Sequence, residues 1–418
     1  MDEEAQIRIE EIGESDILVG IPSYNNERTI AHVIKAVEYG LTKYFPEYKS
    51  VLVNSDGGST DRTREIVEET SVYSDLDTML IKHPTRPASK VVGKYIGTPG
   101  KGSAFKAIFE VARALGVKAC AVVDSDLRSI TPEWVEVLIG PVLSKGFDFV
   151  APYYSRHKYD GTITNMVVYP LTRALYGRRI RQPIGGDFGF SGRLAKNYLE
   201  KDIWGTEVAR YGIDIWMTTT AITEGFRICQ ANLGAKIHEA KDPSKALGPM
   251  FRQVIATTFD LIEREHEYWR EVKGSRATAM FGFRPLVAIE PVSVDLESMI
   301  RGYKEGYEIY KEYWDSFLSK DDLLAIEEIA MLDLDEYHFP ADLWVKIMYD
   351  FAIGYHRKIS GHPTEHDLFF NSLIPLYFGR TASFVIESKD MLNGDAEKLV
   401  EDQCKKFEEM KDYLVERW

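Results

Sequence analysis

Two aspartates, Asp124 and Asp126, end the segment KACAVVDSD, whose apolar run predicts a buried strand over 118–124. Carboxylates two positions apart at the end of one strand can reach a single divalent cation, and their hard oxygen ligands suit Mg²⁺ or Mn²⁺. Surface loops also contain Asp-x-Asp as plain solvated charge. Because ligands of open α/β sheets bind beyond the carboxyl ends of the strands, the position of this pair favours a cation site.

Two other polar segments follow predicted strands, PSYNNE at 22–27 and NSDGGSTD at 54–61. Glycines in the second segment permit close backbone approach to a ligand, and the Asp56 carboxylate can accept hydrogen bonds from a base or ribose. The same residues also make a good turn and helix cap, which needs no ligand. Taken together, three polar strand ends in one array favour a nucleotide site.

A further segment, GKGS at 100–103, precedes a predicted helix. It resembles a small phosphate cradle in which backbone N–H groups, the positive helix end and the Lys101 ammonium act together. The GxxxxGK[ST] spacing of a P-loop is absent. The segment therefore indicates phosphate contact without a P-loop.

The elements that must position these residues are predicted by periodicity. Short apolar runs alternate with amphipathic stretches, as is typical of βαβ units around a mostly parallel sheet. The predicted strands are 16–22, 50–55 and 118–124, and the predicted helices are 27–39, 61–70 and 102–115.

The rest of the chain divides by pattern. Strand-like and helix-like runs mix after residue 126, Gly and Pro break the pattern at 273–295, and helical periodicity dominates beyond, with a last helix at 395–418. We expect a catalytic domain, with a nucleotide-sugar half over 16–126 and an acceptor half over 127–272, followed by a helical extension that serves packing and homodimer formation. The predicted domains are 1–272 and 273–418.

Composition excludes several classes of protein. The 418 residues contain 51 Lys and Arg against 65 Asp and Glu, a net charge of −14, so general binding to nucleic acid is excluded and a phosphate-bearing partner should be small. The 44% of hydrophobic residues exclude a disordered chain. Three cysteines without a CxxC pair, an acidic N-terminus and no long apolar run predict a cytoplasmic protein without membrane insertion.

PSYNNE, NSDGGSTDRT, GKG and DSD in this order resemble a GT-A glycosyltransferase. The later segments IGGDFGFSG, YGIDIW, ANLGAKIHEAKDP and LGPMFRQVIATTF resemble, more specifically, the glucosyl-3-phosphoglycerate synthase and mannosyl-3-phosphoglycerate synthase group. The likeness runs from about residue 17 to 259. It implies an α/β, Rossmann-like, mostly parallel sheet, the fold of nucleotide-diphospho-sugar transferases, with a C-terminal helical extension.

The resemblance also implies roles for single residues. It places Asp124, Asp126 and His238 on Mg²⁺ or Mn²⁺, and Asp187 and Asp214 around the donor sugar and reaction centre, where they would act with Lys101. The implied nucleotide-sugar contacts are Pro22, Tyr24, Asn25, Glu27, Asp56, Lys101 and Ser125. The implied acceptor contacts are Gly161, Thr162, Ile163, Thr164 and Asp187.

Two positions depart from the family pattern and concern the acceptor. The family places a phosphate-binding arginine in the loop that matches 161–164 and an asparagine at position 240. Here the loop has Thr162 and the second position is Ala240, neither of which replaces a guanidinium. Unphosphorylated glycerate therefore becomes a candidate acceptor, unless charge is supplied from elsewhere by Arg156, Lys158, Arg178, Arg179 or Arg181.

We therefore expect a retaining, metal-dependent transfer of glucose or mannose from a GDP- or UDP-sugar to the 2-hydroxyl of D-glycerate or 3-phosphoglycerate, in compatible-solute synthesis. The alternatives are a polyprenyl-phosphate sugar transferase, a nucleotidylyltransferase and a non-catalytic nucleotide-sugar-binding protein. A second metal site at His362, His366 and Asp367 has helical spacing but no clear third ligand.

Overall fold

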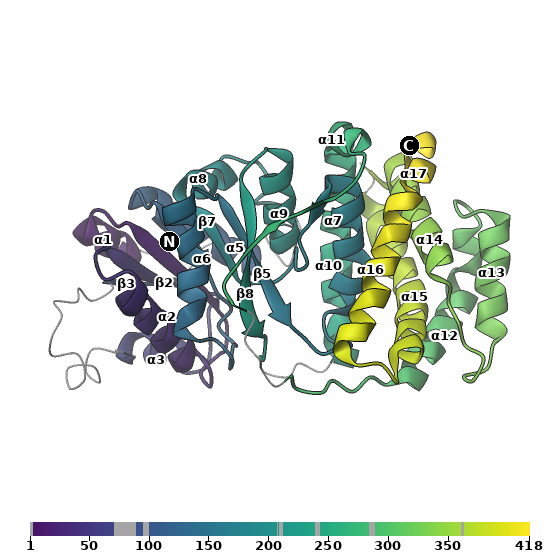
Figure 1. The fold of residues 1–418 in the computed structure, drawn as a ribbon, viewed down its shortest axis with the longest axis horizontal. Coiled ribbons are helices and arrows are strands. Elements are labelled where there is room, and N and C mark those ends of the chain that lie inside the picture. The colour runs from purple at the N-terminus through teal and green to yellow at the C-terminus, as the bar shows by residue number, and fades with distance from the viewer. Residues whose placement is uncertain are drawn as a thin grey trace. The chain divides into compact units, whose positions relative to one another are not determined.

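The computed structural model describes residues 3–70, 89–94, 100–206, 208, 212–238, 243–283, 289–360 and 363–418. They form two compact units, each assembled from separate parts of the chain (Figure 1). The first unit comprises Met1–Ser155, Arg181–Lys241 and Thr278–Ala288, and the second comprises Arg156–Ile180, Asp242–Ala277 and Ile289–Trp418.

The first unit contains an eight-stranded sheet in the order β10-β8-β5-β7-β4-β1-β2-β3. Strand β7 runs antiparallel to β4 and β5, whereas the other described pairings are parallel. The predicted mostly parallel sheet is therefore confirmed. The strands are β1 (Ile17–Ser23), β2 (Ser50–Asp56), β3 (Ser89–Lys94), β4 (Ala119–Val122), β5 (Phe149–Ser155), β7 (Phe188–Ser191), β8 (Ile228–Ala235) and β10 (Ala279–Phe281).

Helices cover both faces of this sheet. In β1, Ile17, Val19 and Ile21 face a core shared with α2 and α6, whereas Gly20 faces α5, where an added Cβ would lie 2.6 Å from the Ile108 side chain. This alternation is the period of two that a strand requires. The helices are α1 (Glu3–Ile12), α2 (Ile30–Tyr44), α3 (Thr63–Glu69), α5 (Lys101–Ala114), α6 (Pro132–Lys145), α8 (Gly192–Leu199) and α9 (Ile213–Thr223).

The predicted strands and helices of 16–126 correspond to β1, α2, β2, α3, α5 and β4. Helix α2 begins at Ile30 and not at residue 27, because the preceding residues form a loop. Strand β10 was not predicted and lies inside the expected break at 273–295. It is only three residues long and is defined by its pairing with β8, so it has no periodic signal of its own.

The second unit is helical. A small parallel ladder of β6 (Arg178–Arg179) and β9 (Arg276–Ala277) accompanies the helices. These are η1 (Thr164–Val168), a π-helical turn, then α7 (Tyr169–Tyr176), α10 (Pro243–Arg264), α11 (His266–Glu271), α12 (Leu296–Trp314), α13 (Lys320–Met331), α14 (Ala341–Gly354), η3 (Tyr355–Ile359), α15 (Pro363–Ser388), α16 (Asn393–Glu409) and α17 (Lys411–Arg417).

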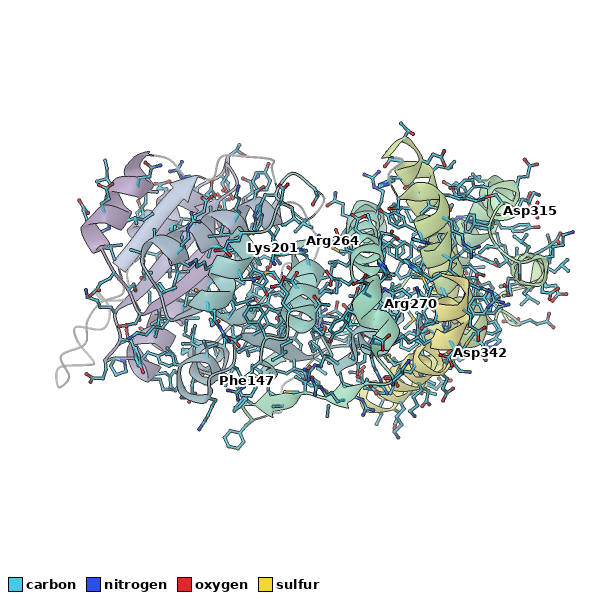
Figure 2. The ribbon with its side chains drawn as sticks, turned by 90° about the horizontal axis from the view of Figure 1, so that it is seen from above. Phe147, Lys201, Arg264, Arg270, Asp315 and Asp342 are labelled. Atoms are coloured by element: carbon cyan, nitrogen blue, oxygen red, sulfur yellow. The ribbon has the colours of Figure 1, made fainter. Side chains whose placement is uncertain are left out.

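Polar contacts join the C-terminal helices to earlier parts of the chain within this unit. The buried Arg173 guanidinium on α7 binds Glu401 at 2.5 Å and Glu408 at 2.9 Å on α16. Within the C-terminal helices, Asp342 on α14, labelled in Figure 2, accepts a 2.5 Å bond from Lys406. Because helices such as α7 pack with the C-terminal part, the predicted single boundary at 273 does not coincide with the division into units.

Two further findings concern membrane-spanning helices and the cysteines. Among the described helices, none is both long and apolar enough to cross a bilayer. Cys120, Cys229 and Cys404 are buried and form no disulfide.

Candidate active site

The loops that follow β1 and β2 are joined by hydrogen bonds. The Asn25 N–H donates to Ser59 Oγ at 2.8 Å, and Asn25 Oδ1 accepts the Thr60 N–H at 2.8 Å. Asn25 has a φ of 54°, in the left-handed region that asparagine tolerates. The Glu27 N–H donates to Asp61 at 3.1 Å. The two predicted nucleotide loops therefore form one surface.

The same surface reaches the loop after β4. Asn26 Oδ1 accepts the Ser125 hydroxyl at 2.8 Å and the Tyr24 N–H at 2.9 Å. Thr29 Oγ1 donates to the Ser125 carbonyl at 2.8 Å. The prediction that three polar strand ends meet at one edge is confirmed, and Asn26, which was not among the predicted site residues, connects them.

Asp56 lies inside the turn that it begins. Its side chain accepts the N–H groups of Gly58 and Ser59, each at 2.9 Å, and the hydroxyls of Ser59 at 2.6 Å and Ser23 at 3.2 Å. These contacts give Asp56 a structural role, and its contact with a base stays a prediction. Beside the end of β1, the Tyr24 side chain is 60% exposed.

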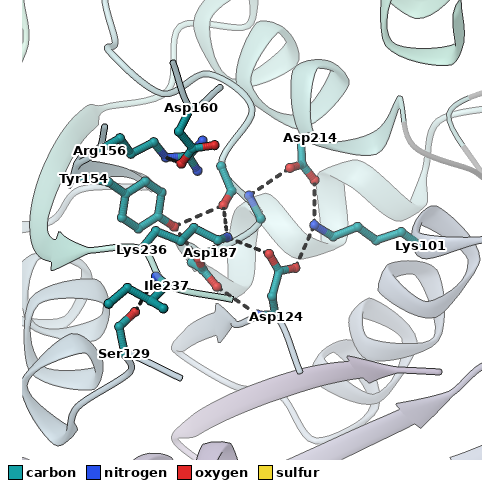
Figure 3. A network of polar contacts seen from close by, with 12 residues as sticks. Lys101, Asp124, Ser129, Tyr154, Arg156, Asp160, Asp187, Asp214, Lys236 and Ile237 are labelled. Atoms are coloured by element: carbon teal, nitrogen blue, oxygen red, sulfur yellow. Dashed lines mark hydrogen bonds and ion pairs between the residues drawn. The ribbon is translucent and has the colours of Figure 1, made fainter. Parts of the chain in front are cut away.

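A partly buried group of opposite charges lies beyond β4 (Figure 3). This acid–lysine cluster consists of Lys101, Asp124, Asp187, Asp214 and Lys236. Lys101 begins α5, Asp124 follows β4, Asp187 precedes β7, Asp214 lies in the first turn of α9, and Lys236 follows β8. Four of these residues were predicted as site residues, and the structure brings them together.

The Asp124 carboxylate lies between two ammonium groups. Lys101 Nζ is 2.9 Å from Asp124 Oδ1 and 3.4 Å from Asp214 Oδ1. Lys236 Nζ donates to Asp124 Oδ2 at 2.7 Å, to Asp187 Oδ2 at 2.8 Å and to the Gly185 carbonyl at 2.7 Å. Both oxygens of Asp124 are thus engaged by lysines.

The other two aspartates are held by backbone donors. The antiparallel pairing of Val122 with Phe188 places Asp187 beside Asp124, whose N–H donates to Asp187 Oδ1 at 2.8 Å. The Tyr154 hydroxyl donates to Asp187 Oδ2. The Gly186 N–H donates to Asp214 Oδ2 at 2.8 Å.

Gly185 and Gly186 permit this close approach. A Cβ on Gly186 would lie 2.1 Å from Asp124 Oδ2, and the φ of Gly186 is +82°. A Cβ on Gly185 would lie 2.3 Å from the Pro152 ring. Only glycine fits at position 186, both for space and for conformation.

Burial and charge oppose each other in the cluster. Burial alone would raise the pKa of Asp124, but Lys101 and Lys236 hold that pKa well below its usual range. Burial raises the pKa of Asp187 against the attraction of Lys236, and raises the pKa of Asp214 against that of Lys101. The pKa of Lys101 rises, because Asp124 and Asp214 outweigh its burial.

His238, the third predicted cation ligand, lies next to the Asp124–Asp126 turn. Leu127 and His238 pair in an isolated antiparallel bridge, and the Arg128 N–H donates to the Ile237 carbonyl at 2.8 Å. Within the described residues, no three His, Cys, Asp or Glu side chains are gathered as a preformed metal site. Asp126 and His238 fit a cation that phosphate oxygens of a ligand would complete, since Mg²⁺ is commonly held by one or two carboxylates plus phosphates.

The predicted acceptor segment 161–164 belongs to the second unit. Thr162 is buried and shares a 2.5 Å hydrogen bond with the Tyr377 hydroxyl. Ile163 is buried, and Thr164 begins η1. Gly161, at a φ of +68°, leaves room for the Arg156 guanidinium, because a Cβ would lie 2.8 Å from Arg156 Nη1. Ala240 lies outside the described residues.

Two other sets of predicted residues have structural partners. Lys158 Nζ donates to the Ser388 carbonyl at 2.6 Å and the Met391 carbonyl at 2.7 Å, at the C-terminal end of α15.

In the predicted second metal site, Asp367 binds Arg252 at 2.5 Å, and His366 Nε2 lies 3.3 Å from the Ile359 carbonyl. His362 lies outside the described residues. The second metal site therefore stays a prediction.

A mostly parallel sheet with polar loops and the acid–lysine cluster at its strand ends is the arrangement of the GT-A fold. Residues 18–204, less than half of the chain, match the sequence model described as Glycosyl transferase family 2, and the chain is a glycosyltransferase.

The similar proteins are more specific. A glucosyl-3-phosphoglycerate synthase of Mycolicibacterium smegmatis is 28% identical over 262 residues, which cover 58% of this chain and 76% of that protein. A glucosyl-3-phosphoglycerate synthase of Petrotoga mobilis is 26% identical over 277 residues, which cover 62% of this chain and 77% of that protein. Among solved structures, glucosyl-3-phosphoglycerate synthase from Mycobacterium tuberculosis matches with a TM-score of 0.44 and 26% identity, covering 60% of this chain and 83% of that one.

Proposed function

We propose that this chain transfers glucose, with retention of anomeric configuration, from a nucleoside diphosphate glucose to the 2-hydroxyl of 3-phosphoglycerate or D-glycerate. The observation that carries the proposal is the acid–lysine cluster at the edge where the three polar loops meet. The names of the two similar synthases support glucose as the sugar and a glycerate-type acceptor.

The loops after β1 and β2 would hold the base and ribose. The exposed Tyr24 ring offers a face on which a base can stack. Lys101, at the positive first turn of α5, would face the diphosphate.

The sugar would lie against Asp187 and Asp214. Asp214 Oδ1 is buried and accepts no hydrogen bond, although Lys101 lies 3.4 Å away. As carboxylates, Asp187 and Asp214 can both accept hydrogen bonds from hydroxyls of a bound sugar.

Of the three predicted cation ligands, Asp126 and His238 would hold Mg²⁺ or Mn²⁺, because the Asp124 carboxylate is already paired with two lysines. Such a cation stabilises negative charge on the leaving diphosphate as a Lewis acid. Lys101 would add to the same electrostatic stabilisation. Retention requires no strong protein base, because the leaving phosphate can take the acceptor proton on the same face.

The acceptor is the open choice. Thr162 supplies no charge for a phosphate, and its hydroxyl is already bonded to Tyr377. Unphosphorylated glycerate is therefore favoured by this loop, whereas 3-phosphoglycerate is favoured by the similar synthases.

The test is a product assay with the full chain. UDP- and GDP-linked glucose and mannose are each incubated with Mn²⁺ and either glycerate or 3-phosphoglycerate, and products are identified by mass and NMR. We expect a glucosylated 2-hydroxyl with the donor's anomeric configuration. No turnover in these incubations would contradict the proposal. So would, in parallel incubations, transfer to an added polyprenyl phosphate, or release of pyrophosphate from a nucleoside triphosphate and a sugar 1-phosphate.

A further inference from the structure

Lys236 is the member of the acid–lysine cluster that the motifs did not predict. Its side chain is only 4% exposed, and three acceptors lie within 2.8 Å of Nζ, one for each N–H. An ammonium fixed in this way is a positioned charge and not a mobile surface lysine.

The position of this charge matters for the cation. Lys236 contacts Asp124 Oδ2, and Lys101 contacts Asp124 Oδ1. On the Oδ2 side, the backbone of Gly186 also lies so close that a Cβ would be 2.1 Å away. A divalent cation that bound Asp124 directly would therefore lie close to two ammonium groups that repel it.

The charge balance has the same consequence. Asp124, Asp187 and Asp214 contribute three negative charges, and Lys101 and Lys236 compensate two of them. Without Lys236, the partly buried Asp124 and the fully buried Asp187 would be adjacent carboxylates, joined through the Asp124 N–H bond of 2.8 Å. Two adjacent carboxylates attract a divalent cation strongly.

We propose that Lys236 is a positioning residue that occupies the cation-attracting side of Asp124 and Asp187, and so restricts the metal to Asp126, His238 and the donor's diphosphate. This inference rests on the proposed cation site. Its consequence is that the cation binds tightly only together with the nucleotide, which prevents a metal-loaded site without donor.

The experiment measures Mn²⁺ affinity from the EPR signal of free Mn²⁺, with and without UDP. In the wild type, UDP should tighten Mn²⁺ binding. In Lys236→Met, Mn²⁺ without UDP should bind at least about tenfold more tightly than in the wild type, because a positive charge a few ångströms from the carboxylates is removed. A merely structural lysine would not tighten metal binding when it is lost.

Lys236→Arg keeps the charge and should keep the wild-type Mn²⁺ affinity. Lys118→Met is the matched control. Lys118 lies just before β4, its side chain is 67% exposed, and it pairs with Asp16. If the Met variant fails to unfold cooperatively, Lys236→Gln repeats the test with a neutral side chain that still donates a hydrogen bond.

The outcomes separate the two proposals. Unchanged or weaker Mn²⁺ binding in a folded neutral variant overturns the role of Lys236 alone. Absence of Mn²⁺ binding by the wild type in the presence of UDP contradicts the proposed cation site itself.

Discussion

Asp124 shows what residue type and spacing predict and what they leave open. Its place at a strand end was predictable from the apolar run before it, and the cluster with Lys101, Asp187 and Asp214 was indicated by motif resemblance. The contact with Lys236 was not, because it depends on where β8 ends relative to β4 and β7. The only signal was a lysine two residues before His238.

At the residue scale, Gly186→Ala should displace Asp124 and so disrupt the acid–lysine cluster. The new Cβ would meet Asp124 Oδ2 at 2.1 Å and require a φ of +82°. We expect the rate of sugar transfer to fall by about 100-fold or more, since ångström-scale displacement in an active site costs this much. Steady-state kinetics would measure the loss.

Gly116→Ala is the control for that variant. Gly116 also has a positive φ, +64°, but nothing lies within 4 Å of an added Cβ. It should lose about 1 kcal/mol of stability from backbone strain and keep its activity. Equal activity losses in both variants would mean that strain alone, and not contact with Asp124, explains the effect.

At the element scale, the strands and helices of 16–126 were predictable because β1, β2 and β4 have apolar runs and α2, α3 and α5 have amphipathic ones. The strand β10 and the packing of α7 with α16 were not, because a three-residue strand and a long-range ion pair leave no periodic trace. The same limit applies to the loops, since their connection through Asn26 depends on tertiary position.

Asn26→Ala should separate the loop after β1 from the loop after β4. It removes the acceptor of the Ser125 hydroxyl and of the Tyr24 N–H. We expect KM for the donor to rise about tenfold with a smaller change in kcat, because one to two hydrogen bonds that shape the donor site are lost. Asn197→Ala on α8 is the control, because it loses one exposed hydrogen bond to Glu224 and should leave KM unchanged. A rise in KM in both variants would contradict the role of Asn26 in shaping the donor site.

At the scale of the whole molecule, the second unit also contains a buried carboxyl group, that of Asp350. Asp350 on α14 accepts the Tyr413 hydroxyl at 2.6 Å through Oδ1, whereas its Oδ2 is buried without a hydrogen bond. Burial raises the pKa of Asp350 to about 6, despite the opposing Tyr413 bond. The charged groups that also act on it are Asp322, Lys346 and Arg417.

Because of this raised pKa, the free energy of unfolding should fall as the pH rises. The folded state binds the proton more tightly than the unfolded state, so the contribution is present at acid pH and is lost as pH rises through about 6. Asp350→Asn should therefore raise the free energy of unfolding by about 1 to 2 kcal/mol at about pH 8 and change it little at about pH 4. Urea unfolding at both pH values measures this.

Asp402→Asn is the matched control, because Asp402 is an exposed residue of α16 that pairs with Lys405 three positions away. Its loss should change stability by less than about 0.5 kcal/mol at either pH. A gain for Asp350→Asn that is the same at acid and alkaline pH would show that the buried charge is not its cause.

The proposed sugar transfer depends on one site that binds a nucleoside diphosphate and a cation together. The most direct measurement is thermal unfolding of the wild type and of Asp126→Ala with UDP or GDP, in the presence and absence of Mn²⁺. A ligand at about 100 times its Kd stabilises a folded protein by about 2.7 kcal/mol, so a clear rise in Tm is expected for the wild type with one of the nucleotides plus Mn²⁺. Asp126→Ala should lose this rise, whereas no rise in the wild type with either nucleotide would contradict the account.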